Sequence, residues 1–168
     1  KLKLKNSKIK KVYPGANDFR NIKEDKFIKI SGNPVLITLA RLEKRKGHEE
    51  ILKSINLIKN KFPSIVYIIA GEGVEEKKLK KIVKEYRLEN NVIFTGLVNE
   101  SQKKYLFTNS DLMVMPTLDE GEKRSIEGFG ISYLEAAFFG IPSIASNIGG
   151  TPEAVLHNKT GIIINNFS

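Results

Sequence analysis

Short apolar runs alternate with longer amphipathic runs along most of this chain, and no other feature limits its fold as strongly. Six segments are short and apolar, as expected of buried strands: 35–40, 65–70, 92–95, 112–115, 142–145 and 161–165. The segments between them have helical spacing or helix-start signals: 47–61, 74–87, 99–107, 130–139 and a short helix from 151. Such alternation requires parallel strands with helices on both faces. The sequence therefore predicts an α/β fold, a single Rossmann-like domain with a doubly wound parallel sheet.

The two ends of the chain differ from this pattern. Residues 1–33 contain one candidate strand, Ile9–Tyr13, and a polar stretch, which is typical of an interdomain linker or edge segment. Residues 34–168 form the predicted domain. Its last strand is not followed by the helix that should cover it, so we expect the domain to be C-terminally truncated.

Composition narrows the classes of function. The chain has no Cys, which excludes a disulfide framework and a thiolate metal site. It has only two His, which argues against a multi-histidine metal centre. No apolar run approaches the roughly 20 residues that span a bilayer, and a cytoplasmic location fits best. The net charge of +9 suits phosphate-bearing ligands, nucleic acid or an anionic membrane surface, although lysines on outer helix faces also serve simply as solvated charge.

The loop after the first predicted strand carries two cations. Ligands of open parallel sheets bind beyond the carboxyl ends of the strands. Arg41 leaves the strand end and Lys46 precedes the next helix. Because a guanidinium binds two oxygens at once and an ammonium adds a flexible point charge, the pair suits a diphosphate. A solvated basic loop is the alternative.

The segment 127–135 joins a loop to a helix and carries two carboxylates. Its two glycines let backbone N–H groups approach an anion at the helix start. Glu135 falls within the apolar part of the helix, so it needs a polar partner. That partner is either the hydroxyl groups of a ribose or a structural lysine or amide.

Two further glycine loops follow strands. Gly149 and Gly150 precede Thr151, which we expect to cap a helix with Pro152 at its first position. The N-terminus of this helix would then face the same crevice and would be a second group suited to bind an anion. Gly71 belongs to a Gly-Glu-Gly turn, which lacks the third glycine of the dinucleotide fingerprint.

These motifs resemble the C-terminal domain of retaining glycosyltransferases of the two-domain GT-B architecture, the large "glycosyl transferases group 1" family. The most specific match is Glu127, seven residues, then Glu135, with the Arg41 and Lys46 spacing beside it. Supporting matches are 12–17, 70–73, 94–98, 110–111 and 149–153, so the resemblance spans most of the chain. The loop 118–126 is longer than usual and resembles that of some phosphatidylinositol mannosyltransferases.

The resemblance implies roles for individual residues. Arg41 and Lys46 would neutralise the donor diphosphate, and Glu127 would contact the transferred sugar. Glu135 would bind the ribose. The remaining expected contacts are the amides of Phe129, Gly130 and Ile131 with sugar and phosphate, and the segment around Val98 with the base.

The implied activity is sugar transfer with retained configuration in glycan, capsule, lipopolysaccharide or glycolipid biosynthesis. The donor would be a UDP- or GDP-linked sugar, with no metal or cofactor required. The partner would be an N-terminal domain of the same enzyme, so this chain alone should be inactive.

Other functions remain open alternatives. A sugar-nucleotide epimerase of similar architecture would not be expected to combine both motif spacings. A nucleic-acid-binding domain should interleave aromatic residues with its lysines, whereas the helix 74–87 offers only Tyr86, so we expect no nucleic-acid partner. Peripheral contact with the inner face of an anionic membrane is compatible with transfer to a lipid-linked acceptor.

Overall fold

The computed structural model describes residues 10–121 and 126–165. Within them, six strands form one sheet in the order β3-β2-β1-β4-β5-β6, and every pair is parallel. The strands are β1 (Val35–Leu39), β2 (Val66–Ala70), β3 (Val92–Gly96), β4 (Leu112–Met115), β5 (Ser143–Ser146) and β6 (Gly161–Ile164). This order confirms the predicted doubly wound α/β fold.

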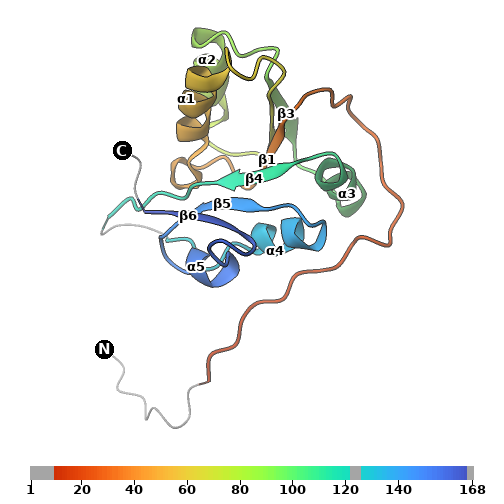
Figure 1. The fold of residues 1–168 in the computed structure, drawn as a ribbon, viewed down its shortest axis with the longest axis vertical. Coiled ribbons are helices and arrows are strands. Elements are labelled where there is room, and N and C mark those ends of the chain that lie inside the picture. The colour runs from red at the N-terminus through yellow and green to blue at the C-terminus, as the bar shows by residue number, and fades with distance from the viewer. Residues whose placement is uncertain (1–9, 122–125, 166–168) are drawn as a thin grey trace.

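Helices cover both faces of the sheet (Figure 1). The face with α1 and α2 is separate from the face with α3, α4 and α5, and each has its own apolar core. The helices are the 3-10 turn η2 (Lys44–Lys46), α1 (His48–Ile58), α2 (Glu76–Glu85), α3 (Glu100–Thr108), α4 (Ile131–Phe138) and α5 (Thr151–Ala154).

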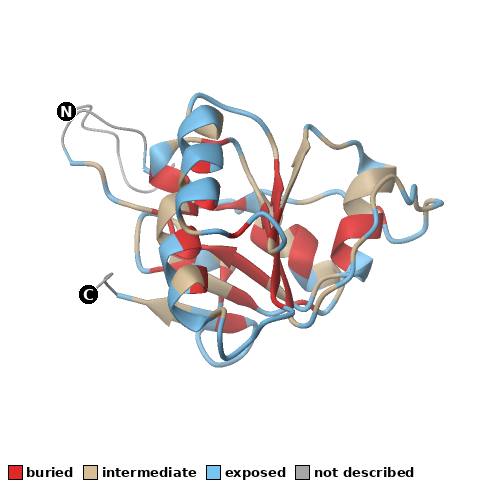
Figure 2. Cartoon of the chain, turned by 90° about the horizontal axis from the view of Figure 1, so that it is seen from above, coloured by how far each residue is buried: buried red, intermediate tan, exposed pale blue. Residues whose placement is uncertain are grey.

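The alternation of side chains along β1 explains the two cores. Val35 and Ile37 face the core of α3 and α4, whereas Leu36 faces the core of α1 and α2. In β2, Ile68 faces the core of α3 and α4 and Ile69 faces the core of α1 and α2, and both are fully buried. Buried residues accordingly follow the strands and the inner sides of the helices (Figure 2). A strand buried on both faces needs an apolar residue at nearly every position, which is what the short apolar runs supply.

Of two helix starts predicted from the sequence, the structure confirms one and contradicts the other. The helix start predicted at residue 99 is confirmed and is a capping box, because the Asn99 side chain accepts from the Gln102 amide and the Gln102 side chain accepts from the Asn99 amide. The prediction that Thr151 caps α5 is wrong. Gly150 occupies the cap, and the Thr151 hydroxyl is buried with no hydrogen-bond partner among the described residues.

The segment that precedes β1 runs along the side of the sheet as an extended chain (Figure 1). Residues 10–13 have no strand pairing, so the predicted strand Ile9–Tyr13 is wrong for its described part, and Ile9 lies outside the described residues. Further along, Phe19 is buried and its ring lies 6.2 Å from that of Phe107 and 5.5 Å from that of Phe139. The predicted domain boundary at 33/34 stays a prediction.

The direction of winding reverses between β1 and β4. In a doubly wound sheet this switch leaves a crevice at the carboxyl ends of the strands, because the loops on either side of it depart in opposite directions. The loops after β1, β2 and β3 and the loop before α4 all end there.

Candidate functional site

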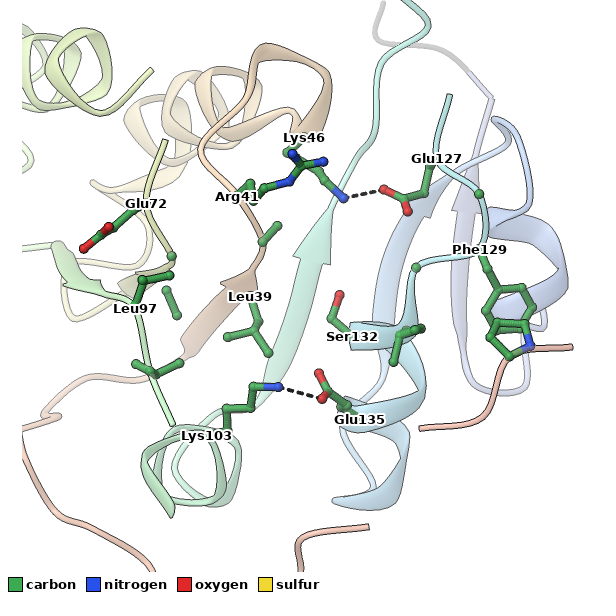
Figure 3. A pocket seen from close by; sticks show the side chains of 18 residues that line it. Leu39, Arg41, Lys46, Glu72, Leu97, Lys103, Glu127, Phe129, Ser132 and Glu135 are labelled. Carbon is green, nitrogen blue, oxygen red and sulfur yellow. Dashed lines mark hydrogen bonds and ion pairs between the residues drawn. The ribbon is translucent and has the colours of Figure 1, made fainter. Parts of the chain in front are cut away.

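A cleft of about 710 Å³ opens at this switch point, which is within the usual size range of small-molecule sites. The loops after β1, β2 and β3 form one wall, and the segment from Glu127 into α4 forms the other (Figure 3). Two ion pairs lie at opposite ends of the cleft, with Leu39 between them. Among the described residues, the lining carries three cations and three carboxylates: Arg41, Lys46, Lys103, Glu72, Glu127 and Glu135.

Lys46 and Glu127 form the ion pair at one end. Lys46 reaches the cleft because the loop turns sharply at Gly47, whose φ is +75° and whose missing Cβ would lie 2.1 Å from the Pro116 carbonyl oxygen. Both side chains are only 10% exposed. Arg45 also donates to the same Glu127 oxygen, at 3.2 Å, from outside the cleft lining.

Arg41 lines the cleft as predicted, but its side chain is 70% exposed. Its guanidinium binds Glu43 at 2.8 Å. An exposed pair of this kind contributes little to stability, so an anion in the cleft can displace it at small cost.

Glu135 and Lys103 form the ion pair at the other end, with 2.8 Å between Nζ and Oε1. Glu135 projects from α4 and Lys103 from α3, and the carboxylate is 10% exposed. The predicted need of Glu135 for a partner is thus met by a lysine, which the sequence analysis kept as an alternative to a ribose. Both side chains line the cleft, so a bound hydroxyl group can reach the same carboxylate.

The start of α4 lines the cleft between the two ion pairs. Gly130 has a φ of +87°, and a Cβ there would lie 2.5 Å from the Tyr133 ring, so only glycine fits. Among the described residues, none accepts a hydrogen bond from the amides of Phe129, Gly130 and Ile131. These N–H groups and the helix dipole make the segment suited to an anionic or hydroxyl-rich ligand.

The second glycine loop lies behind this segment. Gly149, Gly150 and Thr151 do not line the cleft, so the expectation that a second helix start faces it is wrong. The Gly150 amide instead donates to the Glu127 carbonyl at 2.9 Å, and a Cβ on Gly150 would lie 1.9 Å from the Gly128 oxygen. The loop therefore supports the backbone that carries Glu127.

The other predicted residues, Gly71 and Val98, also line the cleft. Four polar contributors to the site were not predicted from the sequence: Lys103, Glu72 and Ser132 in the lining, and Arg45, which pairs with Glu127. Glu72 lies in the Gly-Glu-Gly turn that had been noted for its glycines alone. For Lys103 and Arg45 the local sequence offers no signal, because their carboxylate partners are 32 and 82 residues away.

A chain of buried hydrogen bonds reaches His48, which follows the Lys46 turn in sequence. The Thr38 hydroxyl donates to the Val114 carbonyl, so it accepts from the Tyr67 hydroxyl at 2.8 Å. The Tyr67 oxygen then accepts from Nδ1 of His48, at 3.0 Å. Burial lowers the pKa of His48 from 6.5 to about 4, and the positive charge of Lys46 acts in the same direction.

This depressed pKa predicts a pH dependence of stability. The unfolded chain binds a proton at His48 between pH 6.5 and 4 that the folded chain does not, so stability should fall as pH falls through this window, by about 3 kcal/mol in all. Urea unfolding at several pH values measures it. His48→Gln keeps a hydrogen-bonding group without a proton to titrate, so its curve should be flatter; parallel curves would contradict the prediction.

Neither a candidate metal site nor a membrane-spanning helix occurs in the described ranges, 10–121 and 126–165. No group of three or more His, Asp or Glu side chains in them is placed to hold a metal ion. No helix in them has both the length and the apolar character needed to cross a bilayer.

Comparison with known proteins identifies relatives of this chain. The family model described as "Glycosyl transferases group 1" matches residues 19–168. A GDP-mannose-dependent alpha-(1-6)-phosphatidylinositol monomannoside mannosyltransferase of Mycobacterium tuberculosis is 32% identical over 140 residues. That alignment covers 83% of this chain and 36% of the relative. The protein CapJ of Staphylococcus aureus is 37% identical over 111 residues, covering 66% of this chain and 26% of CapJ.

Solved structures have the same fold. HepE of Anabaena, in complex with UDP and glucose, superposes with a TM-score of 0.68 and 25% identity, over 80% of this chain and 35% of HepE. The C-terminal domain of the group 1 glycosyl transferase LpcC of Francisella tularensis superposes with a TM-score of 0.72 and 22% identity. This second match covers 91% of this chain and 82% of the LpcC domain, and it agrees with the α/β fold described above.

Proposed function

Because this chain belongs to the family of glycosyl transferases group 1, we propose that its cleft binds the nucleoside-diphosphate sugar donor of a retaining glycosyltransferase. The enzyme would act in the biosynthesis of a glycan, capsule, lipopolysaccharide or glycolipid. The observation that carries the proposal is the convergence of Arg41, Lys46, Glu127, Glu135 and the start of α4 on one cleft at the switch point.

The charges of the cleft suit such a donor. In the described part of the lining, cations and carboxylates are equal in number, and each of Lys46 and Lys103 is paired to a carboxylate. A diphosphate brings two negative charges that can take over Lys46 and the exposed Arg41, while the start of α4 offers N–H groups to the same anion. Once the bond to the sugar breaks, these preorganised groups stabilise the charge on the leaving diphosphate.

The two carboxylates would then contact hydroxyl groups. Glu135 would accept hydrogen bonds from the ribose, and Glu127 from the transferred sugar. Val98, beside the exposed Leu97 at the far wall, would contact the base. The named relatives support two kinds of donor, because one depends on GDP-mannose and another binds UDP and glucose. No metal or cofactor takes part in the proposed reaction.

The chain spans 36% of the length of the mannosyltransferase it matches. We propose that a second domain of the same enzyme supplies the acceptor site and the facing wall of the cleft. Bringing donor and acceptor together provides much of the rate of a group transfer. The 168-residue chain by itself should therefore bind nucleotide weakly and transfer no sugar.

Thermal unfolding with added nucleotides tests the donor assignment. GDP, UDP, GDP-mannose or UDP-glucose at about 100 times its Kd should stabilise the chain by about 2.7 kcal/mol, which raises the Tm by roughly 5–10 °C. Adenosine and inorganic phosphate serve as controls for the base and for phosphate alone. If none of the four nucleotides raises the Tm at millimolar concentration, the proposed function is wrong.

Location and further partners stay proposals. We propose a cytoplasmic enzyme with peripheral contact to the inner face of the membrane, supported by the relative that acts on phosphatidylinositol mannoside and by the exposed lysines of α2. Co-sedimentation with anionic vesicles would measure this contact. We also propose that this chain does not bind nucleic acid.

A further inference from the structure

Among the described residues, two cations hold Glu127, and only one of them lines the cleft. The Lys46 ammonium and the Arg45 guanidinium both donate to Oε2 of this carboxylate. Lys46 and Glu127 line the cleft, whereas Arg45 does not. All three side chains are only 10% exposed. One partner of Glu127 is therefore open to a ligand in the cleft, and the other is not part of the cleft lining.

Arg45 is itself fixed in place. Its Nε donates to Glu43 at 2.9 Å, and its carbonyl accepts from the Leu118 amide at 2.8 Å. Glu43 in turn binds Arg41 through its other oxygen. The result is a chain of alternating charges that starts and ends in the loop after β1 and includes Glu127 of the opposite wall: Arg41, Glu43, Arg45, Glu127, Lys46. The two cations at its ends line the cleft, and the cation in its middle does not.

We propose that Arg45 is a positioning residue, which keeps the Glu127 carboxylate paired and oriented when Lys46 moves from Glu127 to the diphosphate of a bound nucleotide. The inference rests on the proposed function. A carboxylate that is 90% buried is costly to leave without a partner. If Arg45 were absent, binding of the diphosphate would remove from Glu127 the last cation that pairs with it among the described residues. With Arg45 present, Lys46 changes partners and Glu127 keeps one.

A double-mutant cycle tests this coupling. The measurement is the Kd of GDP and of UDP by titration calorimetry, for whichever nucleotide the wild-type chain binds. Arg45→Met should weaken nucleotide binding about tenfold when Glu127 is present, because Lys46 is then retained by the carboxylate. In a Glu127→Gln background no carboxylate remains to be orphaned, so Arg45→Met should change the Kd less than about twofold.

Two further variants separate positioning from general structure. Arg45→Lys keeps the charge but lacks the fork that reaches both Glu43 and Glu127, so its Kd should fall between those of wild type and Arg45→Met; it also replaces Arg45→Met if that variant does not fold. Lys53→Met removes a cation that likewise binds two carboxylates, Glu49 and Glu50, away from the cleft, and should leave the Kd unchanged.

The outcomes distinguish the two proposals. If Arg45→Met weakens nucleotide binding tenfold in both backgrounds, Arg45 merely supports the fold. If it weakens binding in neither background, Lys46 does not need Arg45. Either result overturns the inference. A wild-type chain that binds neither nucleotide overturns the proposed function instead.

Discussion

Replacing Lys46 with methionine should weaken binding of the nucleoside diphosphate by about 2 kcal/mol, roughly thirtyfold, and slow sugar transfer by the full-length enzyme by roughly 10²–10³-fold. Among the described residues, Lys46 is the one lysine at the Glu127 end of the cleft lining, and its ammonium would meet the charge that develops on the leaving diphosphate. Methionine keeps the length of the side chain. Arg45 still pairs with Glu127, so the fold should persist.

Titration calorimetry and a donor-turnover assay measure these effects. Lys44 is a suitable control, because it lies in the same 3-10 turn, is exposed and does not line the cleft. Lys44→Met should therefore leave both quantities unchanged. Equal losses for the two variants would mean that the net charge of the loop matters rather than the position of Lys46, and unchanged binding by Lys46→Met would remove Lys46 from the site.

Replacing Gly150 with alanine should weaken donor binding by at least about tenfold, although Gly150 does not line the cleft. The new Cβ would lie 1.9 Å from the Gly128 carbonyl oxygen and 3.2 Å from Cα of Phe129. Both contacts are with backbone, so the segment that carries Glu127 and leads into α4 must shift. Overpacking of this kind costs about 1–3 kcal/mol of stability. Because the shift displaces Glu127 and the free amides together, we expect the Kd of the donor to rise by at least about tenfold.

Gly140→Ala is the matched control for this loss. Gly140 follows α4 with a φ of +71°, and a Cβ there would meet nothing within 4 Å. Its substitution should cost about 1–2 kcal/mol through backbone strain alone and leave donor binding unchanged. Urea unfolding measures the stability of both variants, and titration calorimetry measures the binding. If Gly150→Ala binds the donor as tightly as Gly140→Ala does, the proposed support of the Glu127 segment is wrong.

The sequence by itself determined the layout of this protein. Apolar runs of the length of strands, separated by helical spacing, leave a parallel sheet as the arrangement that buries both. Once the sheet is parallel, every loop that follows a strand lies at one edge, and this places Arg41, Lys46 and Gly71 near one another. The place of Val98 in the site followed from the family resemblance instead. These properties depend on local spacing, and local spacing is visible in a sequence.

Only the tertiary structure decided which charges meet and which loop faces the cleft. Glu135 pairs with Lys103, which is 32 residues away, and Glu127 pairs with Arg45, which is 82 residues away. The sequence around a carboxylate does not indicate such a distant partner. The helix start at Thr151 has the sequence of an anion site, yet it packs beneath the Glu127 segment because Gly150 lets two backbones come within contact distance. Such contacts arise when elements pack, since packing depends on the whole surface of each element rather than on the order of its residues.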